Sequence, residues 1–170
     1  MAKVDKVLSM NSKINKLYEN KFPILITIGF FLIMSYLAFS HNLVWGGYDI
    51  DGINYLNFGR TILEGNGADV RVLNGQVGGP VLFAFLESIF PDAFSTMKII
   101  AILSGTGIVL LSFFITKNIF NYRIAILTQL FIAFNPILHY ISIQALNELL
   151  PIFIIFVSLY VVTKKELGFF

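Results

Sequence analysis

Long apolar stretches alternate with shorter polar segments along the chain, and their lengths predict membrane-spanning helices. Residues 22–40 form an uncharged run. About 20 apolar residues cross the hydrocarbon core of a bilayer, so this run is long enough for one crossing. Similar runs cover residues 97–116 and 124–143, and a shorter one covers residues 147–163. We therefore expect an all-α integral membrane protein with about four transmembrane helices.

The two ends of the chain are polar and basic. Residues 1–21 carry five lysines against two acids, with apolar residues near helical spacing, which predicts a basic amphipathic cytoplasmic segment beside the lipid headgroups. Residues 164–170 form the expected cytoplasmic tail. They also mark a candidate point at which a longer protein is truncated. A signal peptide cleaved near Ser40 is the alternative reading of the first crossing. The apolar run is too long for a usual signal peptide, which favours a retained anchor.

The segment between the first two crossings, residues 41–96, is long, rich in glycine and acidic. It predicts short helices rather than a crossing. One helix is expected from Gly52 to Glu64, with Asp51 at its N-cap and Gly65 at its end. Another, residues 80–90, is apolar enough to lie in the membrane interface but too short to span.

The distribution of charge predicts how the chain is threaded. In this topology nine of the twelve Lys and Arg residues fall on one side of the membrane and seven of the ten acids fall on the other. Because cytoplasmic loops carry an excess of basic residues, both termini are expected in the cytoplasm and the long first loop outside. A prokaryotic plasma membrane is the expected location.

Composition agrees with this layout. Hydrophobic residues make up 56% of the chain and charged residues 13%, and the mean hydropathy is +0.78. Soluble domains carry about 25% charged residues. The chain contains no cysteine, which excludes disulfides, thiolate metal sites and cysteine nucleophiles. The basic tail is interpreted as a topology signal in contact with lipid, and no nucleic-acid partner is expected.

Candidate chemistry centres on the acids just outside the first crossing. Asp51, with Asp49 beside it, lies at the membrane surface in this topology. A carboxylate there could act as general base on an acceptor hydroxyl, or hold a divalent cation against a phosphate leaving group. The alternative for Asp51 is a helix N-cap without a catalytic role, and residue type alone favours that reading.

The residues after Asp51 add a motif. Tyr55 follows Asp51 by four positions, and the helix end carries Arg60, Leu63 and Gly65. Over residues 24–162 the chain resembles the N-terminal part of the membrane-embedded GT-C glycosyltransferases, closest to the group of dolichyl-phosphate-mannose protein mannosyltransferases and aminoarabinose transferases. In that group an acidic motif precedes a tyrosine, and an Ala-Arg-x-Leu-x-x-Gly-like helix end follows. Gly52 stands where a second acid is expected, and Gly79-Pro80-Val81-Leu82 approximates Pro-Pro-Leu.

The resemblance implies transfer of a sugar, with inversion, from a polyprenyl-phosphate donor to an acceptor on the extracytoplasmic face. It implies Asp51 as general base and Asp49 as second acid or metal ligand. Arg60, Arg71 and Lys98 are candidates to bind the donor phosphate, because guanidinium and ammonium groups pair with phosphate oxygens. Each arginine could instead be a solvated cation or the ion-pair partner of Glu64 or Asp69, and Lys98 could simply reach the interface. Mg or Mn is a candidate cofactor.

Further polar residues within or beside the crossings complete the candidate pocket, which also includes Tyr55. His139 follows Asn135 and Pro136 in the third crossing, where a kink with locally satisfied polar groups is the favoured interpretation. Glu148 begins the fourth crossing, where the helix dipole favours a carboxylate. His139 and Glu148 alone are too few ligands to predict a metal site. Ser104 to Gly107 predicts close helix packing through small residues.

The alternative function is a non-catalytic four-helix membrane subunit or scaffold that binds a larger membrane protein. Under either function the lipid bilayer is a partner. The enzyme would in addition bind a polyprenyl-phosphate sugar and could require a missing C-terminal portion.

Overall fold

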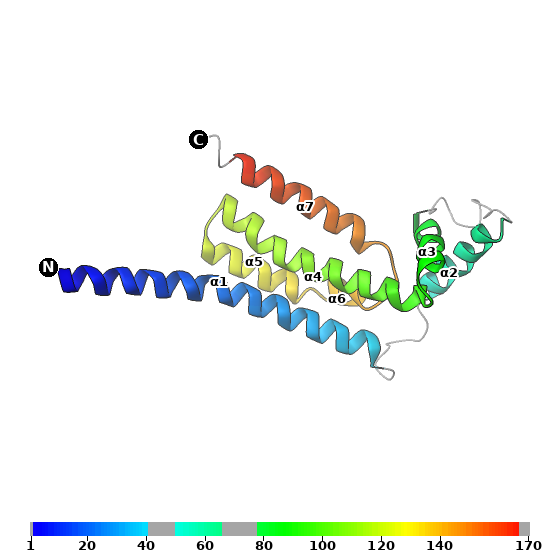
Figure 1. Cartoon of the computed structure of the whole chain (residues 1–170), viewed down its shortest axis with the longest axis horizontal. Coiled ribbons are helices and arrows are strands. Elements are labelled where there is room, and N and C mark those ends of the chain that lie inside the picture. Colours follow the sequence, from blue (N-terminus) through cyan, green and yellow to red (C-terminus); the bar gives the residue numbers. More distant parts are fainter. Residues whose placement is uncertain (1, 41–49, 66–77, 167–170) are drawn as a thin grey trace.

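The computed structural model describes residues 2–40, 50–65 and 78–166, and within these ranges the secondary structure is entirely helical. Figure 1 shows long helices running side by side, with two short helices gathered at one end of the bundle. In chain order the helices are α1 (Ala2–Phe39), α2 (Ile50–Leu63), α3 (Gly78–Ile89), α4 (Ala93–Ile119), α5 (Tyr122–Ala133), α6 (Pro136–Ser142) and α7 (Leu149–Glu166).

Two helices among the described residues are long and apolar enough to cross a membrane. The first is the Lys21–Phe39 part of α1 and the second is α4. At 1.5 Å per residue they extend about 28 Å and about 40 Å, against a hydrocarbon core of about 30 Å. A third candidate is the pair α5 and α6, which meet at an angle of 56°. The expected all-helical structure is thus confirmed for the described residues, which contain two candidate spans, or three when the bent pair is counted as one, rather than the four that were expected.

Large apolar side chains on the outside of these helices explain why they suit lipid. Phe131 is 78% exposed, Leu127 67% and Leu25 62%. These residues lie on α5 and α1, within the apolar segments. A helix that is apolar on its outer face as well as its inner face is typical of a membrane span.

Helix α4 is the centre of the bundle, with α1, α5, α6 and α7 packed around it. Glycines allow two of these contacts. A Cβ atom at Gly105 would collide with the hydroxyl of Ser142, and one at Gly107 would collide with the ring of Phe153 on α7. The predicted packing through small residues in this stretch is therefore confirmed.

Helix α1 is continuous through the boundary expected between a cytoplasmic segment and the first crossing. Pro23 lies in the interior of this helix, 21 residues after its first residue. A proline there removes one helical hydrogen bond. Polar side chains surround this position, since the Pro23 carbonyl accepts hydrogen bonds from the Thr27 hydroxyl at 2.9 Å and from Nε2 of Gln129 at 2.9 Å.

The third expected crossing is broken between Ala133 and Pro136. Pro136 begins α6, and the side chain of Asn135 caps this helix by accepting hydrogen bonds from the backbone N–H groups of Ile137 and Leu138 at 2.9 and 3.2 Å. The favoured interpretation of this motif, a kink with locally satisfied polar groups, is confirmed.

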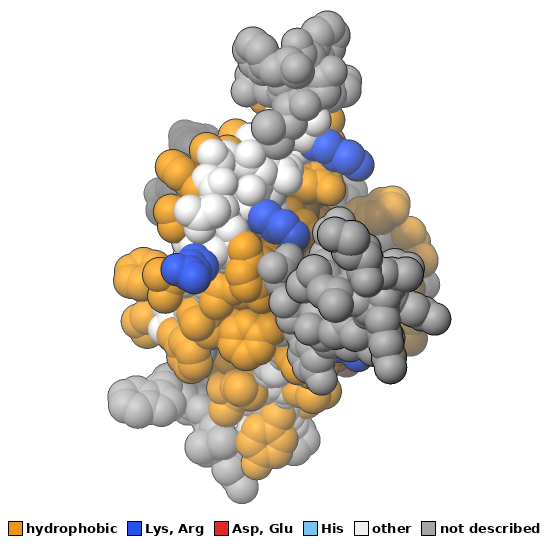
Figure 2. Space-filling model, turned by 90° about the vertical axis from the view of Figure 1, so that its left-hand side faces the viewer, with side chains coloured by type: hydrophobic (Ala, Val, Ile, Leu, Met, Phe, Trp, Pro, Cys, Tyr) orange, Lys and Arg blue, Asp and Glu red, His pale blue; other side chains and the backbone are white. Residues whose placement is uncertain are grey.

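Basic residues lie at the ends of several helices. Lys117 is in the last turn of α4, Arg123 in the first turn of α5, and Lys164 near the end of α7. Figure 2 views the molecule from the side where α4 ends and α5 begins, and shows lysine and arginine side chains among hydrophobic ones on this face. The short helices α2 and α3 lie at the opposite end (Figure 1).

Candidate functional site

Helices α2 and α3 form a closely packed pair that carries most of the candidate residues. Helix α2 ends at Leu63, and Gly65, two residues later, has a φ of 75°, the left-handed conformation favoured after a helix. Gly59 allows the close approach, because a Cβ atom there would lie 2.9 Å from the backbone nitrogen of Ala84 and 3.0 Å from the carbonyl oxygen of Pro80. Asp51 lies in the first turn of α2, inside the helix rather than at the expected N-cap.

Tyr55 of α2 is buried against α3, with 8% of its surface exposed. Its ring lies against the first turn of α3, where a Cβ atom at Gly79 would come within 2.8 Å of Cδ2 of Tyr55. Phe83 and Leu86 of α3, together with Met97 of α4, belong to the same buried cluster. The tyrosine is thus fixed by packing on the end of the bundle.

A pocket of about 290 Å³ opens beside Tyr55. Its lining comes from α2, from the start of α3, and from the first turn of α7 with the two residues before it, and consists of Tyr55, Gly78, Gly79, Asn147, Glu148 and Pro151. The fold therefore brings together Tyr55 and Glu148, two predicted pocket residues that are far apart in sequence. Asp51 precedes Tyr55 by one helical turn on α2.

The electrostatics of the pocket keep the phenol of Tyr55 protonated. Burial raises the pKa of Tyr55 above its usual value of 10.0, and the carboxylates of Glu148 and Asp51 raise it further. At neutral pH the phenol is therefore a hydrogen-bond donor rather than a base. Because the folded chain holds this proton more tightly than the unfolded chain, the stability linked to Tyr55 is complete below about pH 10 and falls as the pH rises above it.

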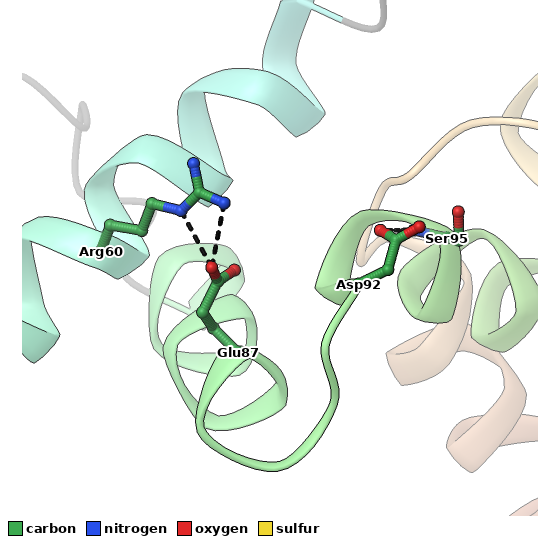
Figure 3. Close-up of polar contacts among 4 residues, drawn as sticks. All are labelled: Arg60, Glu87, Asp92 and Ser95. Carbon is green, nitrogen blue, oxygen red and sulfur yellow. Dashed lines mark hydrogen bonds and ion pairs between the residues drawn. The ribbon is translucent and has the colours of Figure 1, made fainter.

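Arg60, a predicted phosphate ligand, forms an ion pair within the α2–α3 pair. Its Nη2 lies 2.9 Å from Oε1 of Glu87, and its Nε donates a hydrogen bond to the same oxygen at 3.0 Å (Figure 3). The Arg60 side chain is 53% exposed. A ligand phosphate at Arg60 would therefore compete with Glu87.

Lys98, the other predicted phosphate ligand among the described residues, joins α4 to α1. Its Nζ donates a hydrogen bond to the carbonyl oxygen of Ala38 at 3.5 Å and lies 5.2 Å from the centre of the Phe94 ring. Ala38 belongs to the last turn of α1, whose carbonyl groups have no helical partner. Lys98 therefore stabilises a helix end and is not among the residues that line the Tyr55 pocket.

His139, a predicted pocket residue, lies in a different place. Its Nε2 is hydrogen-bonded to the carbonyl oxygen of Ala133 across the kink, and its ring packs edge-on against Phe30 of α1 at 5.5 Å. It lines an apolar pocket of about 210 Å³ between α1 and α5, together with Gly29 and Met34. His139 and Glu148 thus line separate pockets. Within the described residues no group of three or more His, Asp or Glu side chains could hold a metal ion.

Two predicted residues, Asp49 and Arg71, lie outside the described residues. Two polar residues that the sequence reasoning did not single out do have defined places. Asn147 lines the Tyr55 pocket, and its only signal was its position in the short polar break before α7. Gln129 is completely buried between α5 and α1, and an amide in an apolar run was the signal for it.

Comparison with known proteins gives no assignment, since no protein-family model, curated protein or solved structure matches the chain.

Proposed function

We propose that the chain is a membrane glycosyltransferase, or the N-terminal portion of one, that moves a sugar from a polyprenyl-phosphate donor to an acceptor hydroxyl at the extracytoplasmic surface. One observation carries the proposal: Tyr55 and Glu148 line one pocket, and Asp51 lies one turn from Tyr55. These three residues were singled out from sequence as candidate base and pocket-lining groups. Their gathering supports a common site.

The proposed reaction assigns a role to each group. The acceptor oxygen bonds to the anomeric carbon of the sugar while the bond from that carbon to the phosphate oxygen breaks, and polyprenyl phosphate leaves. Asp51 takes the acceptor proton. Tyr55, kept protonated, donates a hydrogen bond to a sugar or acceptor hydroxyl, and Glu148 accepts one. Asp49 and Arg71 remain candidates for the second acid and the phosphate ligand.

The proposal includes a topology of four crossings with both termini in the cytoplasm. The bent pair α5 and α6 would be the third crossing and α7 the fourth. Lys117, Arg123 and Lys164 at one end of the bundle support this orientation, because basic residues mark the cytoplasmic side. The pocket then opens at the outer surface of what we propose is a prokaryotic plasma membrane.

The test measures release of polyprenyl phosphate by the purified chain in lipid nanodiscs, with an added peptide that carries serine and threonine hydroxyls as the acceptor of the sugar. The donors are polyprenyl-phosphate mannose and polyprenyl-phosphate aminoarabinose, which the family resemblance suggests. Asp51→Asn should lower the rate by about 100-fold or more, since a general base contributes about 10²–10⁴-fold. Glu64→Gln, the matched change at the other end of α2, should keep the wild-type rate. Equal rates for Asp51→Asn and wild type, with both chains folded by size-exclusion chromatography, would reject Asp51 as base.

A second candidate function, a non-catalytic subunit, is favoured by the surface of α7. Within the described part of the chain α7 packs substantially against α4 alone, and Ile154, Ile155 and Val162 are about half exposed. A helix of a larger membrane protein could cover this face. In that case neither donor releases polyprenyl phosphate, and a larger membrane protein co-purifies with wild type and with Asp51→Asn alike.

A further inference from the structure

Helix α3 has two different faces. Gly79, Phe83 and Leu86 are buried against the rest of the bundle. On the opposite side Val81, Phe85 and Ile89 are 50%, 59% and 55% exposed. Residues four apart lie above one another on a helix, so these three side chains form one stripe, which we call the α3 stripe. Its members are all large and apolar.

The position of α3 relative to the membrane follows from α4. Lys98 and Lys117 are 19 residues apart on this helix. At 1.5 Å per residue they are separated by about 29 Å, close to the hydrocarbon thickness of about 30 Å. Long basic side chains typically mark the two boundaries of a span. Lys98 also contacts the last turn of α1, so the outer boundaries of both spans coincide at this level.

The first residues of α4 therefore lie in the outer interface. Ala93 precedes Lys98 by five residues, about 7.5 Å, which is comparable to the thickness of one headgroup layer. Helix α3 ends at Ile89, and only three residues separate it from the start of α4. Figure 1 shows α3 running across the direction of α4 at this end of the bundle. A helix across the span direction at this depth lies along the membrane surface.

Charge separates the two sides of α3 in the same way. The one charged residue of α3, Glu87, does not belong to the stripe and is held by Arg60 of α2 (Figure 3). The apolar stripe thus stays free of charge while the polar contacts face α2. Helices that lie in the interface of a bilayer show the same separation of an apolar side from a polar side.

We infer that the α3 stripe inserts into the outer leaflet and holds the α2–α3 pair against the membrane surface. The occupant of this face is lipid, because the helix lies at the depth of the headgroups and of the acyl-chain carbons next to them, and it leads into a span after a short connection. The Tyr55 pocket would consequently be held at the lipid surface. Lipid contact at the stripe is independent of any transfer reaction.

The test uses tryptophan as a depth probe in the full-length chain. Trp45 is the only tryptophan in the sequence, so Trp45→Phe gives a background without tryptophan fluorescence. Phe85→Trp, Val81→Trp and Ile89→Trp each report one position of the stripe. Asn57→Trp, at an exposed position of α2, is the matched control. Each variant is reconstituted into phosphatidylcholine vesicles whose acyl chains carry bromine, a quencher, either near the headgroup or near the chain end.

Insertion predicts blue-shifted emission for all three stripe variants and loss of most of their intensity with bromine near the headgroup. Val81→Trp and Ile89→Trp, at the two ends of the stripe, should lose similar fractions of their emission intensity, because α3 is expected to lie parallel to the membrane surface. Asn57→Trp should emit at longer wavelength and keep its intensity. Blue-shifted emission without quenching would mean that protein covers the stripe, and red-shifted emission would mean that it faces water. Quenching of Ile89→Trp alone would mean that α3 points away from the membrane. Each of these results would overturn the inference.

Discussion

Gly59→Ala tests the closest backbone contact at the candidate site. The added Cβ atom would lie 2.9 Å from the nitrogen of Ala84 and 3.0 Å from the carbonyl oxygen of Pro80, about 0.5 Å short of ordinary van der Waals contact. Both atoms belong to the backbone of α3, so no side-chain rotation relieves the overlap. The α2–α3 pair must therefore separate.

Two effects of opposite sign set the size of the change. Replacing glycine by alanine inside a helix stabilises it by about 1 kcal/mol. Overpacking against a fixed neighbour costs about 1–3 kcal/mol. The net expectation is destabilisation by up to about 2 kcal/mol, which corresponds to a decrease in Tm of up to about 4–8 °C for a chain of this size.

The assay is thermal stability in one detergent, followed as loss of the monodisperse peak in size-exclusion chromatography. Gly29→Ala is the matched control, because it also lies inside a helix but a Cβ atom there meets nothing within 4 Å. The control should keep or raise the Tm. If Gly59→Ala raised the Tm as much as Gly29→Ala, the close approach of α2 and α3 would be refuted.

Two further predictions concern polar contacts at the same end. Asp92 caps α4 by accepting a hydrogen bond from the backbone N–H of Ser95 at 3.0 Å (Figure 3). Hydrogen bonding by the Ser95 side chain, and then by this backbone N–H, lowers the pKa of Asp92. Asp92→Ala should cost about 0.5–2 kcal/mol and Asp92→Asn much less. The contribution of the carboxylate should be complete above about pH 4 and lost as the pH falls through the lowered pKa. Equal Tm values for both variants at pH 7 would contradict the cap. For the half-exposed pair of Arg60 and Glu87, a double-mutant cycle should give a coupling below about 1 kcal/mol that weakens with salt. A larger coupling would show that the pair is desolvated.

Features that depend on neighbouring residues could be predicted from the sequence. The apolar runs of α1 and α4 are continuous, and the requirement for internal hydrogen bonds in lipid leaves helix as the structure of such a run. Gly65 and Pro136 act on the backbone within one turn, so the end of α2 and the break before α6 follow from residue type.

Features that depend on the rotation and crossing of helices could not be predicted. Arg60 pairs with Glu87 because Gly59 brings α3 close, and the sequence contains no sign of that approach. Lys98 was a candidate either to bind phosphate or to reach the membrane interface, and its contact with the end of α1 could not be predicted, because it depends on how α4 packs against α1. The joint position of Tyr55 and Glu148 likewise requires the packing of α2, α3 and α7 around the end of α4.

The buried contact between Gln129 and Pro23 has a consequence for biosynthesis. It joins residues that are 106 positions apart. Translation at about 5–20 residues per second therefore separates their synthesis by about 5–20 s. If α1 enters a bilayer as it is made, it does so before α5 exists, and its own Thr27 hydroxyl is then the side-chain donor to the Pro23 carbonyl. In that case α1 has to be stable in lipid by itself, and its packing with the rest of the bundle is a later, separate stage of assembly.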